Sequence, residues 1–588
     1  MKLPPFVTKG VSLAAGIALI LQVRPAPAQQ IDRGDDEADQ VVARVAFLTG
    51  DVSYNRGDDP DDWQPAALNF PMTQGDRLFT TKGAKMELQT DEATVFLGSE
   101  TELSALTMTD GETQLSIAAG TATFRVHHLS EDGSFEVGTP NASVTFDTPG
   151  SFRISVDANG NTCVIARRGK ATVAAGGGQV RIEPGDELDV AGIDRPRYDV
   201  VDAAAPDGWD QWVEARARAE RGGGSAVDTS QTKLVGMAEL DRDGRWQEIP
   251  GYGRVWTPNV VEVDWAPYRV GHWAWVAPWG WTWISSEAWG WAPYHYGRWV
   301  TYSSHWYWVP EAPAAHARWS PALVAFVGAG PGWSANVSIG GGGYVGWFPL
   351  APRDPFVPWW GHARANVSVT NVTYVNRNFV TVVNHETFVS SAPVVRNLVR
   401  DAAVVKQVSA APVTRGPIPA APTKASLRIS GTAVAAPVAR PPAAMLARPV
   451  VTKSEPPPPR TRFAAEEKAE YKQPAKPPAA AAPAGKQAAQ PPDALVPAGK
   501  QAASAAPAPI QKQVVPVSPG AITAKAVVQP RTIRPAQPQQ TGKAAEIALA
   551  PHDNKAPRRQ VEPLSAKPHP KSNRDKKKEP APQNETKK

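Results

Sequence analysis

Short apolar runs separated by turn residues dominate the chain from Val41 to about Val190. Within each run apolar and polar residues alternate, as in residues 151–156 (SFRISV). This period of two predicts β-strands with one buried face, because successive side chains of a strand point to opposite faces. Gly, Asp, Asn and Pro separate the runs and supply tight turns. The pattern predicts an all-β domain over residues 41–195, and we expect an all-β fold class for the chain.

One segment shows a helical period instead. Residues 206–220 place Trp209, Trp212, Val213 and Arg216 at positions i, i+3, i+4 and i+7, and glycines follow at 222–224. This narrow stripe predicts one helix that packs on one side only. We expect it to be the connecting helix within a connector over residues 196–240, which joins the first β domain to the next.

Tryptophan marks a second domain. Of the 21 Trp residues, 18 lie between Trp246 and Trp360. Residues 265–273 (WAPYRVGHW) recur as residues 291–299 (WAPYHYGRW). A repeat favours a folded unit, and since aliphatic residues are scarce here its core must be aromatic. We predict a Trp-rich β domain over residues 241–400, in which residues 367–389 also alternate as strands.

A β-hairpin is predicted inside this domain, with a three-residue loop that includes Gly280 in the left-handed conformation. In the predicted register Trp275 faces Trp283, and Trp273 and Trp281 lie diagonally on the same face of the sheet. A two-residue loop would instead divide these pairs between the two faces.

The aromatic rings of this domain permit two interpretations. Buried rings would form its core, since each indole removes up to about 250 Å² from solvent. Exposed rings would form a platform on which sugar rings stack, with neighbours such as Arg269, His272, His295 and Arg298 bonding to hydroxyl groups. The candidate residues for glycan stacking or interaction are Trp265, Tyr268, Trp273, Trp275, Trp281, Trp283, Trp291, Tyr294, Trp299, Trp306 and Trp308.

Charge is divided unevenly. Residues 401–588 hold 30 Lys and Arg against 12 Asp and Glu, a net +18, so residues 1–400 carry −13 of the total of +5. The acidic first part lacks the basic surface of a nucleic-acid-binding protein, and specific nucleic-acid binding is not expected. The last part is rich in Pro, Ala and Lys and cannot bury enough apolar surface to fold. We predict a disordered basic tail over residues 401–588, able to contact anionic envelope surfaces.

The N-terminus has the pattern of a secretory signal peptide over residues 1–28: lysines at 2 and 9, an apolar stretch at 11–21, and small residues at 26 and 28. A retained anchor is the alternative. An acidic linker follows at 29–40. No later segment approaches the length of a membrane span, so we expect no transmembrane segment in the mature chain and a periplasmic or extracellular location.

Candidate chemistry is sparse. Glu287, with Glu262 or Asp264 opposite, is the one carboxylate pairing that we considered for glycoside hydrolysis, and a plain turn residue is the alternative. The single Cys163 excludes a disulfide framework, and the ten His show no helical metal-ligand spacing. We therefore expect no catalytic residue, no metal site and no cofactor.

Short motifs recur in a fixed order through the first domain: GDV (50–52), WQP (63–65), GDRL (75–78), GTATFRV (120–126), GSFRI (150–154) and GD (185–186). In this order they resemble the FecR domain, an extracytoplasmic β module of bacterial envelope proteins. FecR regulators sense an envelope signal and pass it to a sigma factor through a transmembrane helix ahead of this domain. This chain has the signal-peptide pattern there, so the resemblance implies the β module alone.

Four further stretches, DRDGRW (241–246), YGRVW (252–256), 265–308 and VGWFPL (345–350), resemble an uncharacterised Trp-rich domain that often follows a FecR domain in secreted bacterial proteins. That resemblance implies no activity. We expect a non-enzymatic envelope protein that acts as an interaction or scaffolding module. The alternatives are binding of peptidoglycan or another polysaccharide by the Trp-rich domain, and envelope signal sensing. A cell-wall glycan or an envelope protein would be the partner.

Overall fold

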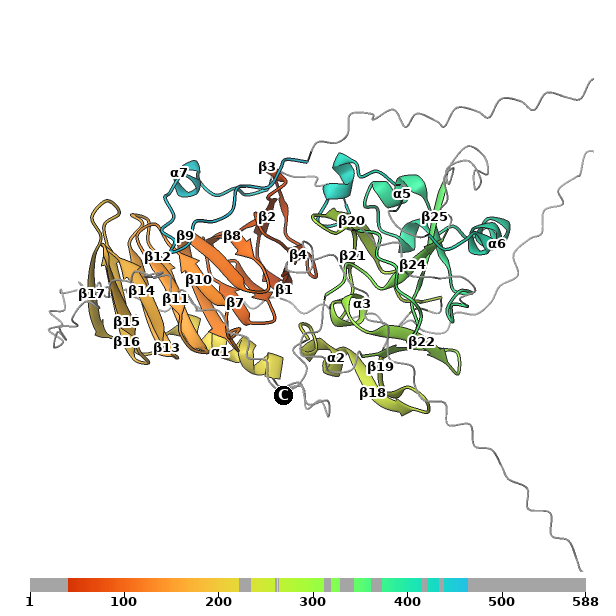
Figure 1. Cartoon of the computed structure of the whole chain (residues 1–588), viewed down its shortest axis with the longest axis horizontal. Helices are drawn as coiled ribbons and strands as arrows, with labels where there is room; N and C mark the ends of the chain where they lie inside the picture. The colour runs from red at the N-terminus through yellow and green to blue at the C-terminus, as the bar shows by residue number, and fades with distance from the viewer. Residues whose placement is uncertain are drawn as a thin grey trace, which may run out of the picture. The chain divides into compact units, whose positions relative to one another are not determined.

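The computed structural model describes residues 41–221, 234–259, 262, 264–310, 319–327, 343–360, 373–414, 418, 420–432 and 438–463 of the 588-residue chain. The predicted signal peptide and acidic linker, and residues 464–588 of the predicted tail, lie outside the described residues. Strands predominate over short helices (Figure 1), so the all-β prediction is confirmed. None of the described helices is long and apolar enough to cross a membrane.

Residues 43–221 form what we call the N-terminal β unit, which has seventeen strands and helix α1 (Gly208–Arg221). The strands are β1 (Ala43–Thr49), β2 (Val52–Arg56), β3 (Asp59–Pro65), β4 (Pro71–Met72), β5 (Arg77–Thr80), β6 (Lys85–Gln89), β7 (Ala93–Leu97), β8 (Glu102–Met108), β9 (Glu112–Val126), β10 (Ser134–Gly138), β11 (Ser143–Phe146), β12 (Gly150–Val156), β13 (Thr162–Arg168), β14 (Ala171–Ala175), β15 (Gly178–Ile182), β16 (Asp186–Ala191) and β17 (Arg197–Asp202).

Two layers of strands build this unit, and β9 belongs to both. The first layer has the order β4-β1-β6-β7-β9-β12-β13-β16-β17. The second has the order β3-β2-β5-β8-β9-β10-β11-β14-β15, with β9 and β10 parallel. β9 passes from the second layer to the first at Gly120, where φ is +95° and a Cβ would lie 2.3 Å from Thr101 Oγ1. Only glycine fits this crossover.

Phenylalanine rings join the two layers. Phe152 of the first layer stacks on Phe146 of the second with ring centroids 4.6 Å apart, and Phe124 contacts Phe135 across the layers at 6.2 Å. All four rings are buried. The alternating pattern therefore places one apolar row per strand in a shared core, as the sequence predicts.

Helix α1 packs on the outer face of the first layer. Val213 and Ala217 are buried against Phe96, and Trp209 Nε1 donates a hydrogen bond of 2.8 Å to Thr123 Oγ1. The one-sided packing matches the predicted stripe. Within the predicted connector, β17 continues the sheet of the N-terminal β unit to residue 202, and α1 packs on this unit and also contacts α2 (Ala238–Asp243).

Residues 234–414 form what we call the aromatic domain. Its elements are α2 (Ala238–Asp243), β18 (Gly244–Ile249), β19 (Gly253–Pro258), β20 (Gly271–Val276), β21 (Gly280–Ser285), α3 (Ala292–His295), β22 (Arg298–Tyr302), β23 (His305–Val309), β24 (Val324–Val327), β25 (Tyr344–Pro349), β26 (Thr381–Asn384), α5 (His385–Val389), η1 (Val395–Asn397) and α6 (Ala402–Ala410). The strands form three small sheets, β18-β19-β23-β22, β20-β21 and β24-β25-β26.

The hairpin β20–β21 has a loop of three residues, 277–279, and Gly280 has the predicted left-handed conformation, with a φ of +75°. Gly280 is the first residue of β21 and lies outside the loop, so the predicted position of the loop is off by one residue. The predicted pairing is wrong: Trp273 faces Trp283 and Trp275 faces Trp281. All four rings still share one face, because both registers keep residues of the same parity together.

Two other expectations differ from the structure. Residues 385–389, expected as strand, form helix α5, which places Phe388 against Trp281 with ring centroids 4.4 Å apart. Residues 401–463, expected as disordered tail, contain α6, η2 (Lys424–Leu427) and α7 (Ala443–Leu446). Asp401 caps α6 by accepting hydrogen bonds from the Ala403 and Val404 amides at 2.8 and 3.0 Å.

Candidate functional site

Most of the aromatic residues proposed for glycan stacking are buried. Nine of the eleven candidates have at most 8% of their surface exposed, the most exposed of the nine being Trp306. Only Trp265 and Trp275 are half-buried. Stacking on a sugar needs an open ring face, so the core interpretation holds for these nine residues, and a stacking role stays a prediction for the two half-buried rings.

Hydrogen bonds fix several of these rings by their indole nitrogens. Trp299 Nε1 donates to the carbonyl oxygen of Pro293 at 2.9 Å, Trp308 Nε1 to that of Tyr296 at 2.8 Å, and Trp281 Nε1 to that of Ala420 at 2.9 Å. An indole whose ring is buried and whose N–H group is hydrogen-bonded inside the protein has a structural role. The repeated WAPY segments also meet, since Tyr268 donates to the carbonyl oxygen of Tyr294 at 2.9 Å.

Glu287 lies in the turn between β21 and α3 and is half-buried. Its carboxylate accepts hydrogen bonds from Trp265 Nε1 at 2.8 Å and from the Tyr294 hydroxyl at 2.5 Å. Burial raises the pKa of Glu287 to about 7, against the opposing effect of these donors. The Glu287 carboxylate is therefore held by hydrogen-bond donors on two sides, as expected for a residue with a structural role.

Asp264 and Glu262, the carboxylates that the sequence suggests as partners of Glu287, make other contacts. Asp264 forms an ion pair with Arg400 at 3.1 Å, and both side chains are exposed. Glu262 is exposed, and its backbone carbonyl accepts the Trp265 amide at 3.0 Å. Both carboxylates are thus exposed, whereas that of Glu287 is held by Trp265 and Tyr294.

The structure brings Cys163 close to Glu187 and Asp189, on the paired strands β13 and β16, with their ligand atoms within 4.8 Å of one another. Burial and the two carboxylates raise the pKa of the Cys163 thiol well above its usual range.

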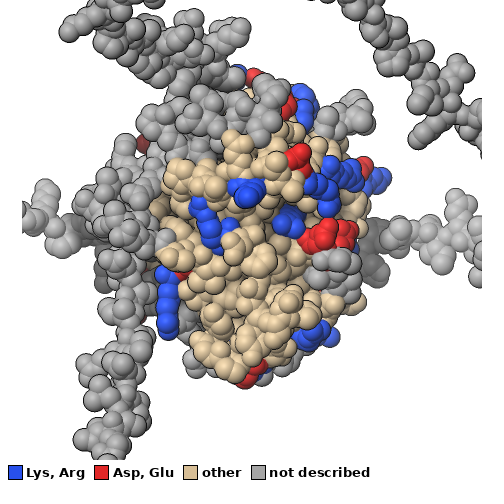
Figure 2. All heavy atoms as spheres, turned by 90° about the vertical axis from the view of Figure 1, so that its right-hand side faces the viewer, with Lys and Arg blue, Asp and Glu red and all other residues tan. Residues whose placement is uncertain are grey.

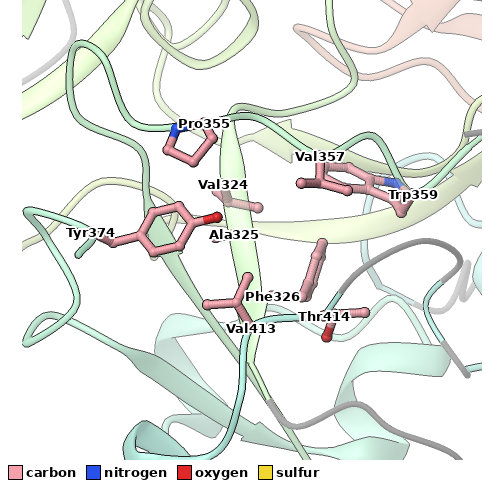
Figure 3. A pocket seen from close by; sticks show the side chains of 9 residues that line it. All are labelled: Val324, Ala325, Phe326, Pro355, Val357, Trp359, Tyr374, Val413 and Thr414. Carbon is pink, nitrogen blue, oxygen red and sulfur yellow. The ribbon is translucent and has the colours of Figure 1, made fainter. Parts of the chain in front are cut away.

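A small hollow lies beside β24 in the aromatic domain (Figure 3). Val324, Phe326, Pro355, Trp359 and Tyr374 line most of it, and the Tyr374 hydroxyl points toward the strand. Its free volume of about 10 Å³ is that of a single water molecule, so it is no cleft for a sugar.

One face of the molecule is drawn in Figure 2. Uncharged residues predominate there, and Lys, Arg, Asp and Glu side chains are scattered among them. Among the described residues drawn in Figure 2, Lys and Arg alternate with uncharged and acidic side chains and do not form one broad patch.

A polar surface that the sequence pattern does not reveal lies on the outer face of the second layer of the N-terminal β unit. There Glu136 Oε1 accepts the Lys453 amide at 2.5 Å, and Gln114 Nε2 donates to the Ser454 carbonyl oxygen at 2.9 Å. Gln64 forms two similar hydrogen bonds to the main chain: its Oε1 accepts the Ile429 amide at 3.1 Å, and its Nε2 donates to the Leu427 carbonyl oxygen. Parts of the described stretches 427–432 and 438–463 thus return to this unit, with α7 (Ala443–Leu446) packed near β9 (Figure 1).

The sequence of this surface looks like that of a solvent-exposed sheet face. The outward positions of β9 and β10 hold Gln114, Ser116, Glu136 and Gly138, which are polar or small, as on a solvated sheet face. Yet Gln114 and Glu136 have only 0% and 2% of their surface exposed. A polar outer face cannot reveal from sequence that another segment covers it.

Comparisons with known proteins assign little. Residues 237–354 match the sequence profile of a family of unknown function (DUF6600), which covers most of the resolved strands of the aromatic domain. A search of curated proteins found no match. Two crystal structures from Parabacteroides distasonis ATCC 8503, of a protein described by inference as an anti-sigma factor, are 21% identical over 24% of this chain, with TM-scores of 0.20 and 0.21. The match spans 64% of the solved chain, less than two thirds of it, and TM-scores this low carry no conclusion.

Proposed function

We propose that this protein is a non-enzymatic interaction or scaffolding module of the bacterial envelope. One observation carries the proposal: polar side chains of the N-terminal β unit hold the main chain of a distant segment, as at Glu136 and Gln114. Hydrogen bonds to the main chain supply affinity when a protein binds an extended peptide, which supports an interaction role for this face.

The finer parts of the proposal come from the sequence. The signal-peptide pattern supports secretion to the periplasm or the cell exterior. The ordered motifs that resemble a FecR domain support an extracytoplasmic sensing or relay role for the same module. Glycan binding by the buried tryptophans is not part of the proposal, because their ring faces are enclosed.

The test uses the full chain expressed at its native level in a bacterial host. Mild cross-linking of intact cells, followed by fractionation and mass spectrometry, should recover the chain in the envelope fraction, linked to a defined protein in reproducible ratio. A chain recovered only from the cytoplasm, or only free of any cross-linked protein, would contradict the proposal.

A further inference from the structure

The covered face of the second layer holds a row of polar groups against one extended segment. Ser143 Oγ donates to Glu136 Oε1 at 2.5 Å, and Gln114 Nε2 donates to Glu136 Oε2 at 3.1 Å. These bonds orient the carboxylate and the amide toward residues 451–454. Hydrogen bonds within the face therefore hold these side chains in position independently of their bonds to the segment.

This face contacts the segment through its main chain. In addition to the Glu136 and Gln114 contacts, the Thr139 carbonyl oxygen accepts the Val451 amide at 2.9 Å in an antiparallel bridge. The N–H groups of Val451 and Lys453 are required, whereas Pro449 can precede them because its position makes no such bond. Pro456–Pro459, which have no N–H group, follow these donors, so the face accepts a segment with prolines on both sides of its two amide donors.

Gly138 makes this close approach possible. A Cβ on Gly138 would lie 2.7 Å from Val450 Cγ1 and 2.9 Å from the Val451 carbonyl oxygen. Gly138 has no left-handed φ, so nothing in its own backbone conformation requires glycine. Within the described structure, the segment is what leaves no room for a side chain here.

Arginines fix the two ends of the segment. Arg448 Nη1 donates to the carbonyl oxygens of Ala118 and Asp157 at 2.6 and 3.0 Å. At the other end Arg460 lies 4.0 Å from Asp76 and Arg462 lies 2.7 Å from Asp61. The face therefore matches an extended segment with a basic residue on each side.

Apolar anchoring of the segment is slight. Helix α7 has no buried residue, and Val450 has 41% of its surface exposed. Segments held by polar contacts with little apolar burial open locally more readily than a core strand does.

From these contacts we propose that the outer face of the second layer is a peptide-binding site, that residues 448–463 are its resident ligand in cis, and that an extended, basic, proline-rich segment of another protein exchanges with them in trans. The inference rests on the proposed function as an interaction module and names the chemistry of its partner. Because the resident segment is tethered, its high effective concentration makes the site closed to weak competitors.

The first experiment measures fluorescence anisotropy of a labelled peptide that copies residues 446–463. A full-length variant with Val451→Pro and Lys453→Pro loses both amide donors in cis, and it should bind the peptide at least tenfold more tightly than the unaltered chain. Adding Gly138→Ala to that variant should weaken binding at least tenfold. A peptide with the same two prolines should bind at least tenfold more weakly to the released variant.

Equal binding of the peptide by the released and unaltered chains, or equal binding of the two peptides, overturns the inference. Circular dichroism and urea midpoints verify that each variant folds. A second measurement needs no variant: hydrogen exchange of residues 448–454 in the unaltered chain should speed up at least threefold when an isotopically heavy peptide is added in excess. No acceleration overturns exchange in trans, while the cross-linking test of the envelope role is unaffected.

Discussion

Replacing Glu287 with Gln should remove a pH dependence from the stability of the aromatic domain. The folded chain raises the pKa of this carboxyl from 4.5 to about 7, chiefly by burial. Because the folded state binds this proton more tightly than the unfolded chain does, the free energy of unfolding falls as pH rises from about 4.5 to about 7. Above about pH 7 this contribution no longer changes with pH. Gln keeps the shape and can accept from Trp265 Nε1 without ionising.

The size of the effect follows from the two pKa values. Their difference corresponds to at most about 3.4 kcal/mol at 1.36 kcal/mol per pH unit. Because Glu287 is half-buried, solvent screening reduces this ceiling, and we expect about 1–2 kcal/mol. Between pH 5 and pH 8 the unaltered chain should lose this much stability relative to the Glu287→Gln variant.

Urea unfolding followed by Trp emission is the suitable assay, because 18 of the 21 Trp lie between residues 246 and 360. The buried His272 and His295, whose pKa values are lowered to about 4 and about 3, lower stability in both proteins at acid pH and cancel in the difference. Glu248→Gln, at an exposed position of β18, is the matched control. Parallel pH profiles for the unaltered and Glu287→Gln chains would refute the reasoning.

Three further predictions concern packing and ligands. Gly244→Ala should lower the free energy of unfolding in urea by about 1–3 kcal/mol, because the added Cβ would lie 2.2 Å from the buried Trp256 ring. Gly111→Ala is the control, since there is open space around Gly111, and it should change the free energy of unfolding by less than about 0.5 kcal/mol. Arg216→Ala should lower the free energy of unfolding by about 3 kcal/mol, because it removes the cation that lies 2.7 Å from the buried carboxylate of Glu87. Protease should then cleave α1 faster, and an unchanged cleavage rate would count against a stabilising role for this ion pair. Peptidoglycan fragments at millimolar concentration should leave Trp emission unchanged in a variant with Trp265→Phe and Trp275→Phe, and a saturable shift in that variant would disprove that the enclosed rings are core alone.

Apolar periodicity predicts the elements that bury one face. The alternation over residues 41–190 yields the strands of the N-terminal β unit, and the stripe containing Val213 yields α1. The same pattern cannot choose the register of β20–β21. Both the predicted and the observed pairings keep Trp273 and Trp281 on one face, so burial of the rings does not distinguish them.

Contacts between distant residues account for what the sequence did not show. Helix α5 forms where the local pattern favours a strand, because Phe388 fills a gap among the rings around Trp281. The averaged composition of residues 401–588 hid the short α6, although Asp401 as cap and buried Val404 and Val408 one turn apart are a local helix signal. The contacts of Glu136 have no such signal, since main-chain recognition selects no side-chain pattern.

The bond between Glu136 and Lys453 joins residues 317 positions apart. Chains are synthesised at roughly 5–20 residues per second, so roughly 16–63 s pass between the emergence of the first residue and that of the second. In the later part of that interval, once β15 (Gly178–Ile182) has been synthesised, all strands of the second layer are present and only the covering segment is still to come. A nascent chain therefore passes through a stage at which another protein meets no tethered competitor, and the order of synthesis itself sets when this surface is open.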